Sequence, residues 1–352
     1  MRSFEHGYLL DQTISHNLLA MVRTLGEFKG RQDLYREQSP QVLETLKKGA
    51  MVESVESSNR IEGVTMEVER LEPLVAKKIK PKDRSEEEIA GYRDVLGEIH
   101  TNAKRLNLSP KLILDFHRKL YAHTPHQGGS WKEKDNAIWE TSPDGRKFIR
   151  FRPVSAVATP EYMEKLCTLY HETMEQRQAE PLLAISSYIL DFESVHPFPD
   201  GNGRLGRLLT LLLLYQADYE VGRYISLERI VEQSKETYWD ALLKSSQGWH
   251  EAKHDLRPWW SYLLGTVIAA YKEFEVRVGD LAATRGAKGG AVRHAVARLP
   301  DRFSMRELRK ACPGVSPAMV RVVLRKLQKE GLIAPSGKGP GAVWKKRGNV
   351  SK

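Results

Sequence analysis

Apolar residues recur every three or four positions along most of the chain, the spacing of a helix that buries one face. Ser85 and Glu88 form a capping box ahead of one such stripe, and Ser109 with Pro110 provides a cap and a first-turn proline ahead of another. The two stripes are Ile89, Tyr92, Leu96 and Ile99, then Leu112, Ile113, Phe116 and Leu120. Further helices are predicted over 7–27, 39–60, 159–178, 182–195, 227–246 and 256–276. The fold class is therefore expected to be mainly α.

One segment departs from this helical pattern. Two β-prone runs, 137–139 and 148–151, flank Pro143-Asp144-Gly145, which is a turn signal. The pattern predicts a short β-hairpin over 136–151 in an otherwise helical protein.

The last part of the chain has its own pattern and its own charge. Helices are predicted over 291–298, 305–311 and 316–330, with a turn at 312–315, and strand-prone residues follow at 332–334 and 342–344 on either side of a Gly/Pro/Ser/Lys stretch. From Arg285 onward there are 17 Lys or Arg residues and three acidic ones, a formal charge of +14 that exceeds the +10 of the whole chain. A polyanion surface is expected there and not on the preceding part.

The order of these elements resembles a winged helix-turn-helix domain over 285–347, with the helix 316–330 in the recognition place. This resemblance implies contact with duplex DNA, in which Arg321, Arg325, Lys326 and Lys329 would meet phosphates. Protein binding or dimerisation is the alternative role for such a domain.

Composition indicates an intracellular protein of two or three domains. Cys167 and Cys312 are the only cysteines among 352 residues, too few for a disulfide framework or a zinc site. The N-terminus lacks the apolar core of a signal peptide, and the longest apolar run, 208–214, is far shorter than the roughly 20 residues of a membrane span. We expect a cytoplasmic location and no membrane partner.

The segment 196–207 carries the strongest chemical signal. His196 is the only group in it that can take a proton near neutral pH. Gly201 and Gly203 allow the backbone amides to face an anion at the start of a helix, predicted to begin at about Arg204. These residue types predict a polyphosphate site with a base beside it.

Two guanidiniums and a carboxylate complete the predicted polyphosphate site. Arg204 and Arg207 lie three residues apart, so both leave one helical face and can fork phosphate oxygens. Asp200 supplies the hard oxygen ligand that magnesium takes when it arrives on a nucleotide.

The whole segment resembles the HPFxDGNGRxxR signature of Fic-domain enzymes, matched at every specified position. The resemblance implies a protein adenylyltransferase that moves AMP from ATP to a Tyr, Thr or Ser hydroxyl of a protein, including itself, and releases pyrophosphate. ATP would be the substrate and Mg²⁺ the cofactor, with Asn202 and the loop amides stabilising the charge on the α-phosphate.

The same resemblance assigns roles to the hairpin and to an aromatic pair. The hairpin would be the flap that clamps the target over the nucleotide, through Ala137, Ile138, Trp139, Ile149 and Arg150. Tyr238 and Trp239 would lie beside the adenine, where aromatic rings suit a base. Trp239 replaces the usual tyrosine, and simple core packing is the alternative.

An inhibitory segment is implied upstream. Ser58, Glu62 and Gly63 fit the pattern Ser/Thr-x-x-x-Glu-Gly/Asn of Fic proteins that carry an autoinhibitory helix ahead of their core. Glu62 would then pair with Arg207 and occupy the place of the γ-phosphate. The expected organisation is a helical region over 1–105 with its motif at 58–63, a Fic core over 106–280, and the winged helix over 285–347.

Other functions stay open at this point. The same loop would serve a different nucleotide donor, or removal of AMP with Glu62 orienting a water. A DNA-binding regulator that uses the Fic fold as a nucleotide sensor is a third reading, against which an intact His196 argues. The sequence does not identify the target, the activating signal or the oligomeric state, for which a homodimer is one option.

Overall fold

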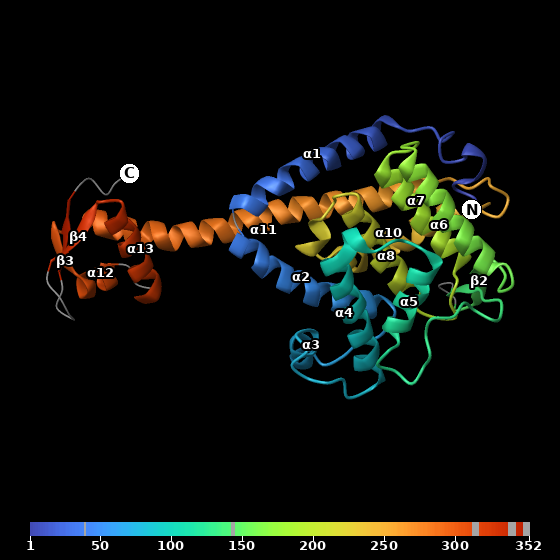
Figure 1. Cartoon of the computed structure of the whole chain (residues 1–352), viewed down its shortest axis with the longest axis horizontal. Coiled ribbons are helices and arrows are strands. Elements are labelled where there is room, and N and C mark those ends of the chain that lie inside the picture. Colours follow the sequence, from blue (N-terminus) through green and yellow to red (C-terminus); the bar gives the residue numbers. More distant parts are fainter. Residues whose placement is uncertain (39, 142–144, 312–316, 337–342, 348–352) are drawn as a thin grey trace. The chain divides into compact units, whose positions relative to one another are not determined.

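The computed structural model describes the chain outside residues 39, 142–144, 312–316, 337–342 and 348–352; for 33–38, 40–42, 140–141, 279–291, 294, 298 and 310 it describes the backbone only. The chain divides into two compact units, Met1–Glu275 and Val276–Lys352 (Figure 1). Each is described by itself.

The first unit is helical, as predicted, with one short hairpin at its edge (Figure 1). The hairpin strands are β1 (Ile138–Thr141) and β2 (Lys147–Phe151), which pair antiparallel with Trp139 opposite Ile149. The helices of this unit are α1 (His16–Gln38), α2 (Pro40–Ile61), α3 (Val68–Val75), α4 (Arg84–Asn102), α5 (Pro110–Leu120), α6 (Thr159–Glu175), α7 (Pro181–Val195), α8 (Asn202–Gln216), α9 (Leu227–Gln233), α10 (Lys235–Ser246) and the start of α11 (Arg257–Arg298). Short 3₁₀ helices lie at Glu5–Gly7, Ala103–Arg105 and Val221–Arg223.

Helix α7 is buried along almost its whole length. Two tryptophans at the start of α11 fix it: Trp259 Nε1 donates to the Ser186 carbonyl at 2.8 Å, and Trp260 Nε1 donates to Ser187 Oγ at 2.9 Å. Nearer its end, Asp191 accepts hydrogen bonds from Trp249 Nε1 at 2.6 Å and from Ser3 Oγ at 2.7 Å. A helix held at so many points gives a fixed platform for the loop that follows it.

The second unit has a small core of its own. After the C-terminal part of α11 come β3 (Arg302–Ser304), α12 (Met305–Ala311), α13 (Pro317–Lys329), β4 (Ile333–Ser336) and β5 (Val343–Lys346), and the strands form an antiparallel sheet in the order β3-β5-β4. The core includes Val292, Val296, Phe303, Leu308, Val320, Leu324, Leu327 and Ile333. Helix α13 buries its apolar side there and leaves its basic side exposed.

Several helix boundaries differ from the predicted ones for local reasons. The first helix begins at His16 and not at residue 7, because Ser15 Oγ accepts a hydrogen bond from the Leu18 amide at 3.2 Å. Helix α4 is capped by Asp83, not Ser85, since the Asp83 carboxylate accepts from the Glu86 amide at 3.0 Å. By contrast, Ser109 caps α5 as predicted.

Other differences concern continuity. The predicted helix 227–246 is interrupted at Ser234, where φ is −113° and ψ is 27°. The segments predicted as separate helices over 256–276 and 291–298 both belong to α11. The helix of the 196–207 segment begins at Asn202, two residues before Arg204.

Some predicted turns lie partly or wholly outside the described residues. They are the hairpin turn, at Pro143 and Asp144, the turn 312–315 with the cap Ser316, and the stretch 337–342. Within the part of the chain that is described, no helix is long and apolar enough to cross a membrane.

Candidate active site

His196 follows the last residue of α7 and turns the chain into the glycine-rich loop. Its backbone is left-handed, with φ 48° and ψ 62°, and its amide still donates to the Phe192 carbonyl at 2.9 Å. Few non-glycine residues adopt this conformation, because it brings Cβ close to the backbone. Pro197, which fixes its own φ, follows directly. The imidazole is therefore placed by the backbone at the end of a buried helix.

The loop between α7 and α8 is closed by Asn202. Its Oδ1 accepts from the Phe198 amide at 2.9 Å, and its Nδ2 donates to the Phe198 carbonyl at 2.8 Å. Asn202 is 2% exposed, so its side chain is committed to the loop in this structure. Its predicted contact with an α-phosphate stays a prediction.

The two glycines of the loop serve different purposes. Gly201 has φ 83°, in the left-handed region that favours glycine. A Cβ on Gly203 would lie 2.5 Å from Glu62 Oε1, too close for any side chain to fit without moving that carboxylate. The Glu62 carboxylate thus lies against the first turn of α8, the positive end of the helix dipole, where an anion is expected to bind.

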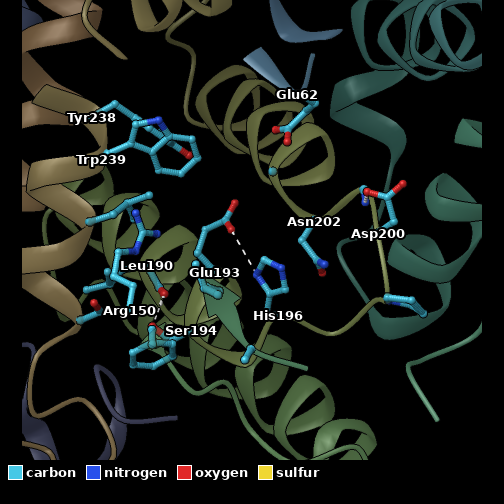
Figure 2. A pocket seen from close by; sticks show the side chains of 18 residues that line it. Glu62, Arg150, Leu190, Glu193, Ser194, His196, Asp200, Asn202, Tyr238 and Trp239 are labelled. Carbon is cyan, nitrogen blue, oxygen red and sulfur yellow. Dashed lines mark hydrogen bonds and ion pairs between the residues drawn. The ribbon is translucent and has the colours of Figure 1, made fainter. Parts of the chain in front are cut away.

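A pocket opens above this loop (Figure 2). Its walls come from the end of α2, the flap, the end of α7, the loop and α10. Figure 2 shows Tyr238 and Trp239 on one side and Asp200 on the opposite side, with His196 between them. The lining residues that the sequence predicted are Glu62, Ala137, Ile138, Arg150, His196, Asp200, Gly201, Asn202, Gly203, Tyr238 and Trp239.

Electrostatics keep His196 in the form of a base. Burial, followed by the nearby charge of Lys132, lowers the pKa of His196 to about 4, so the imidazole is neutral at pH 7. Glu193, one helical turn earlier on α7, places Oε2 3.8 Å from His196 Nδ1 (Figure 2). Burial raises the pKa of Glu193 to about 7, even though the charge of Arg207 acts in the opposite direction.

Arg207 is held by the two residues of the predicted inhibitory motif. Its Nη2 donates to Glu62 Oε1 at 2.8 Å and to the Ser58 carbonyl at 2.9 Å, and its Nε donates to Ser58 Oγ at 2.9 Å. Helix α2 ends at Ile61, and Gly63 with φ 80° turns the chain away, so Glu62 projects from the helix end. Arg207 is 6% exposed, which strengthens a charged contact of this kind.

Arg204 is placed differently from the prediction that it shares a phosphate-binding face with Arg207. It is 1% exposed, does not line the pocket, and donates to Glu88 Oε2 at 2.7 Å and to the Tyr121 hydroxyl at 2.9 Å. Its Nη2 lies 3.5 Å from Asp200 Oδ2. In this structure the guanidinium supports Asp200, and its contact with a phosphate stays a prediction.

Asp200 fits the role of a magnesium ligand that acts together with a nucleotide. Burial would raise the pKa of its carboxyl, but the Tyr121 hydrogen bond and the charge of Arg204 hold that pKa below its ordinary value. The carboxylate is therefore ionised at neutral pH. Among the described residues, no three His, Cys, Asp or Glu side chains cluster to form an all-protein metal site. A single carboxylate on the pocket wall is the donor set of a Mg²⁺ that rides on phosphates.

The aromatic pair and the flap meet through a cation–π contact. Arg150 Cζ lies 5.2 Å from the centre of the Trp239 ring, and that ring lies edge to face with Tyr238 at 4.8 Å. Trp139 and Ile149 do not line the pocket; Trp139 is 60% exposed and borders a neighbouring groove between the flap and α10.

Sequence reasoning missed three side chains that act on this site. Glu193 lies three residues before His196, a helical spacing that would have pointed to it. Lys132 and Asn136 gave no such signal, because they lie in an irregular segment whose contacts are with a distant loop.

The comparisons with known proteins agree with one another. Residues 107–214 match the Fic/DOC family. A curated relative from Nematostella vectensis, named protein adenylyltransferase Fic, is 24% identical over 224 residues, which cover 60% of this chain and 45% of the relative. The relative of the same name from Aedes aegypti is 24% identical, over 63% of this chain and 41% of its own. The chain thus spans less than half the length of these relatives.

The fold is shared with solved structures. A Fic family protein from Desulfovibrio desulfuricans superposes with a TM-score of 0.62 at 20% identity, over 96% of this chain and 98% of that one. Together these comparisons show a Fic fold and a sequence similarity to the Fic/DOC family over residues 107–214.

Proposed function

We propose that the protein is an autoinhibited adenylyltransferase that moves AMP from ATP to a Tyr, Thr or Ser hydroxyl of a target protein, including itself. The observation that carries the proposal is one pocket lined by a neutral His196, the helix start at Asn202 and the Glu62 carboxylate, which accepts a hydrogen bond from the adjacent Arg207. The name shared by the curated relatives supports the same chemistry.

The chemistry assigns separate tasks to the parts of the pocket. His196 takes the proton of the incoming hydroxyl, whose oxygen attacks the α-phosphorus in line. The bond from that phosphorus to the bridging oxygen breaks, and pyrophosphate leaves. Asp200 would hold Mg²⁺, which supplies charge neutralisation of the phosphates when bound. The loop amides and the dipole of α8 stabilise the charge that develops on the transferred group.

Inhibition would follow from competition for one guanidinium. Glu62 accepts a hydrogen bond from Arg207 Nη2 and lies against the first turn of α8, the place a terminal phosphate of ATP would need. Because Glu62 is part of the same chain, its effective concentration at this site is high. The protein would stay inactive until the end of α2 moves away.

The decisive experiment tests the identity of the nucleotide donor and the release of inhibition together. Purified parent and Glu62→Gly protein are incubated with α-labelled ATP, CTP, GTP and UTP, and label on protein is measured. Transfer from ATP, stronger in the variant, supports the proposal. Stronger transfer from CTP, GTP or UTP would identify that nucleotide as the donor in place of ATP. Loss of AMP from a pre-modified protein that requires Glu62 would assign the reverse reaction.

The exposed basic residues of the second unit support an additional role, the binding of duplex DNA. Arg321, Arg325, Lys326 and Lys329 lie on the exposed side of α13, which carries no acidic residue between Pro317 and Lys329. An unneutralised basic helix face on a small domain suits the phosphates of a duplex. We propose that this winged-helix arrangement contacts DNA, with protein binding as the alternative outcome of a DNA-retention test.

A further inference from the structure

Lys132 is a buried cation that the proposed chemistry does not use. It is 3% exposed, and its Nζ donates to the Val195 carbonyl at 3.0 Å and to the His196 carbonyl at 3.0 Å. Its own amide donates to the Pro197 carbonyl at 2.9 Å. These acceptors are three consecutive carbonyls at the end of α7, where the helix dipole is negative and the carbonyls lack partners within the helix.

Asn136 completes the arrangement from four residues further on. Its Oδ1 accepts from Lys132 Nζ at 2.8 Å, and its Nδ2 donates to the His196 carbonyl at 3.2 Å and to the Phe198 carbonyl at 3.1 Å. Every carbonyl from Val195 to Phe198 therefore accepts a hydrogen bond from this pair of residues. Asn136 is also the first residue of the predicted flap.

We propose that Lys132 and Asn136 form a clip that positions His196 and ties the base to the flap. This inference rests on the proposed function, because it concerns the same pocket. A left-handed backbone at a non-glycine residue persists only where its surroundings enforce it. The clip holds the backbone in this conformation through hydrogen bonds to the carbonyls of Val195, His196 and Pro197. The flap and the imidazole then move as one piece.

The clip has an electrostatic effect as well as a geometric one. The charged groups that influence His196 are Lys132 and Arg150, which favour the neutral imidazole, and Glu62, which opposes them; Glu193 also lies on its Nδ1 side. Burial lowers the pKa of Lys132 to about 8, so its ammonium remains charged at pH 7. Lys132 therefore helps to keep His196 a proton acceptor.

The phosphate-binding part of the loop has contacts of its own besides those of the clip. Asn202 accepts from the Phe198 amide and shares the Phe198 carbonyl with Asn136, and α8 begins directly after Gly201. Loss of the clip should therefore disturb the base more than the nucleotide site. This separation makes the proposal testable.

The test uses the full chain in the Glu62→Gly background. Lys132→Met should lower the rate of AMP transfer at saturating ATP by about 10- to 100-fold, because a shift of about 1 Å at the base has that effect. The dissociation constant for ATP should change less than about threefold. Because Lys132→Met also removes a charge, the ratio of the rate at pH 5 to that at pH 8 should fall by about threefold or more.

Three variants separate the two effects of the clip. Asn136→Ala should slow transfer without moving the acid limb of the pH profile, since the Lys132 charge remains. Lys132→Arg should restore the acid limb. Lys134→Met, at an exposed lysine two residues along, should resemble the parent.

NMR titration of the His196 ring, assigned by its loss in His196→Asn, gives a readout that needs no activity. His196 should titrate at higher pH in Lys132→Met than in the parent. If Glu62→Gly transfers no nucleotide, the proposed function fails while this titration still tests the clip. A ring titration, transfer rate and pH profile all unchanged in Lys132→Met would overturn the proposal.

Discussion

Glu62 and Arg207 lie 145 positions apart in the sequence and 2.8 Å apart in the structure, where the guanidinium donates to the carboxylate. The carboxylate lies at the same time within 2.5 Å of the place a Cβ on Gly203 would take. The end of α2 therefore contacts both the arginine and the helix start that a nucleotide would need. The first two predictions concern these contacts of Glu62.

Glu62→Gly should raise auto-adenylylation about 10- to 100-fold, because a charge-assisted hydrogen bond of about 1.5–3 kcal/mol no longer competes with phosphate. Incorporation of AMP is measured by intact mass at fixed ATP. Glu56→Gln, six residues earlier on α2, is the control and should leave the rate near that of the parent. A Glu62→Gly protein no faster than the parent would show that this end of α2 is structural only.

Arg207→Ala should not reproduce the effect of Glu62→Gly, although both break the same pair. The substitution removes the inhibitory partner and the phosphate anchor together, and it leaves Glu62 free of its partner. The double variant should be as inactive as Arg207→Ala alone. Transfer rates of the four forms make a double-mutant cycle, and an active double variant would mean that Arg207 does not bind ATP.

His196→Asn should abolish transfer while ATP binding survives. Asparagine tolerates the left-handed backbone at this position, so the loop is preserved and the proton acceptor alone is lost. Binding is measured by calorimetry and transfer by label from α-labelled ATP, both in the Glu62→Gly background. Equal loss of binding and transfer would point to a collapsed loop, and undiminished transfer would exclude His196 as the base.

Glu193→Gln should stabilise the protein at alkaline pH. The folded pKa of Glu193, about 7, lies above its ordinary 4.5, so the parent gains stability from the protonated carboxyl below pH 4.5 and loses it as pH rises through 7. Glutamine has no proton to lose. Relative to the parent, the variant should gain about 1–3 kcal/mol between pH 5 and pH 8.5. Urea unfolding at the two pH values measures this, and a pH-independent difference would contradict the raised pKa.

Duplex DNA should be retained by the full-length protein at low salt and released as salt increases. Replacing Arg321 and Arg325 by Ala should reduce the slope of log affinity against log salt by about two, because each arginine that meets a phosphate releases counterions. Arg23→Ala, at an exposed arginine in the first unit, is the control for loss of a surface charge outside α13. Absence of DNA retention in the parent at low salt would redirect the second unit to protein contacts.

The features most accessible from the sequence were those encoded by residues close together in the chain. The mainly α class, the hairpin, the cap at Ser109 and the loop at 196–207 all follow from local spacing and turn residues. The pairing of Glu62 with Arg207 was reached through resemblance of two short patterns, not through any local rule. That resemblance supplied the long-range contact that helical periodicity cannot give.

The features that escaped prediction depend on partners distant in sequence. Arg204 was predicted to bind phosphate together with Arg207; its contact with Glu88 of α4, which the sequence did not predict, joins residues 116 positions apart, and the phosphate contact stays a prediction. Lys132 and Asn136 donate to carbonyls about 60 residues away in the sequence, and no pattern of side chains predicts these contacts. The break at Ser234 arises where its hydroxyl meets Tyr262, a contact with a later helix.

Gly203 has a consequence for how this protein can evolve. The missing side chain at this position makes room for the Glu62 carboxylate, and the same space lies on the face of α8 where a phosphate would bind. In the proposed mechanism, a larger residue at 203 would crowd the inhibitory carboxylate and the phosphate alike, and loss of Arg207 would remove a partner from both. A change at Glu62 would act on the carboxylate alone. We therefore expect activating substitutions at the end of α2 and not on the α8 side of the pocket.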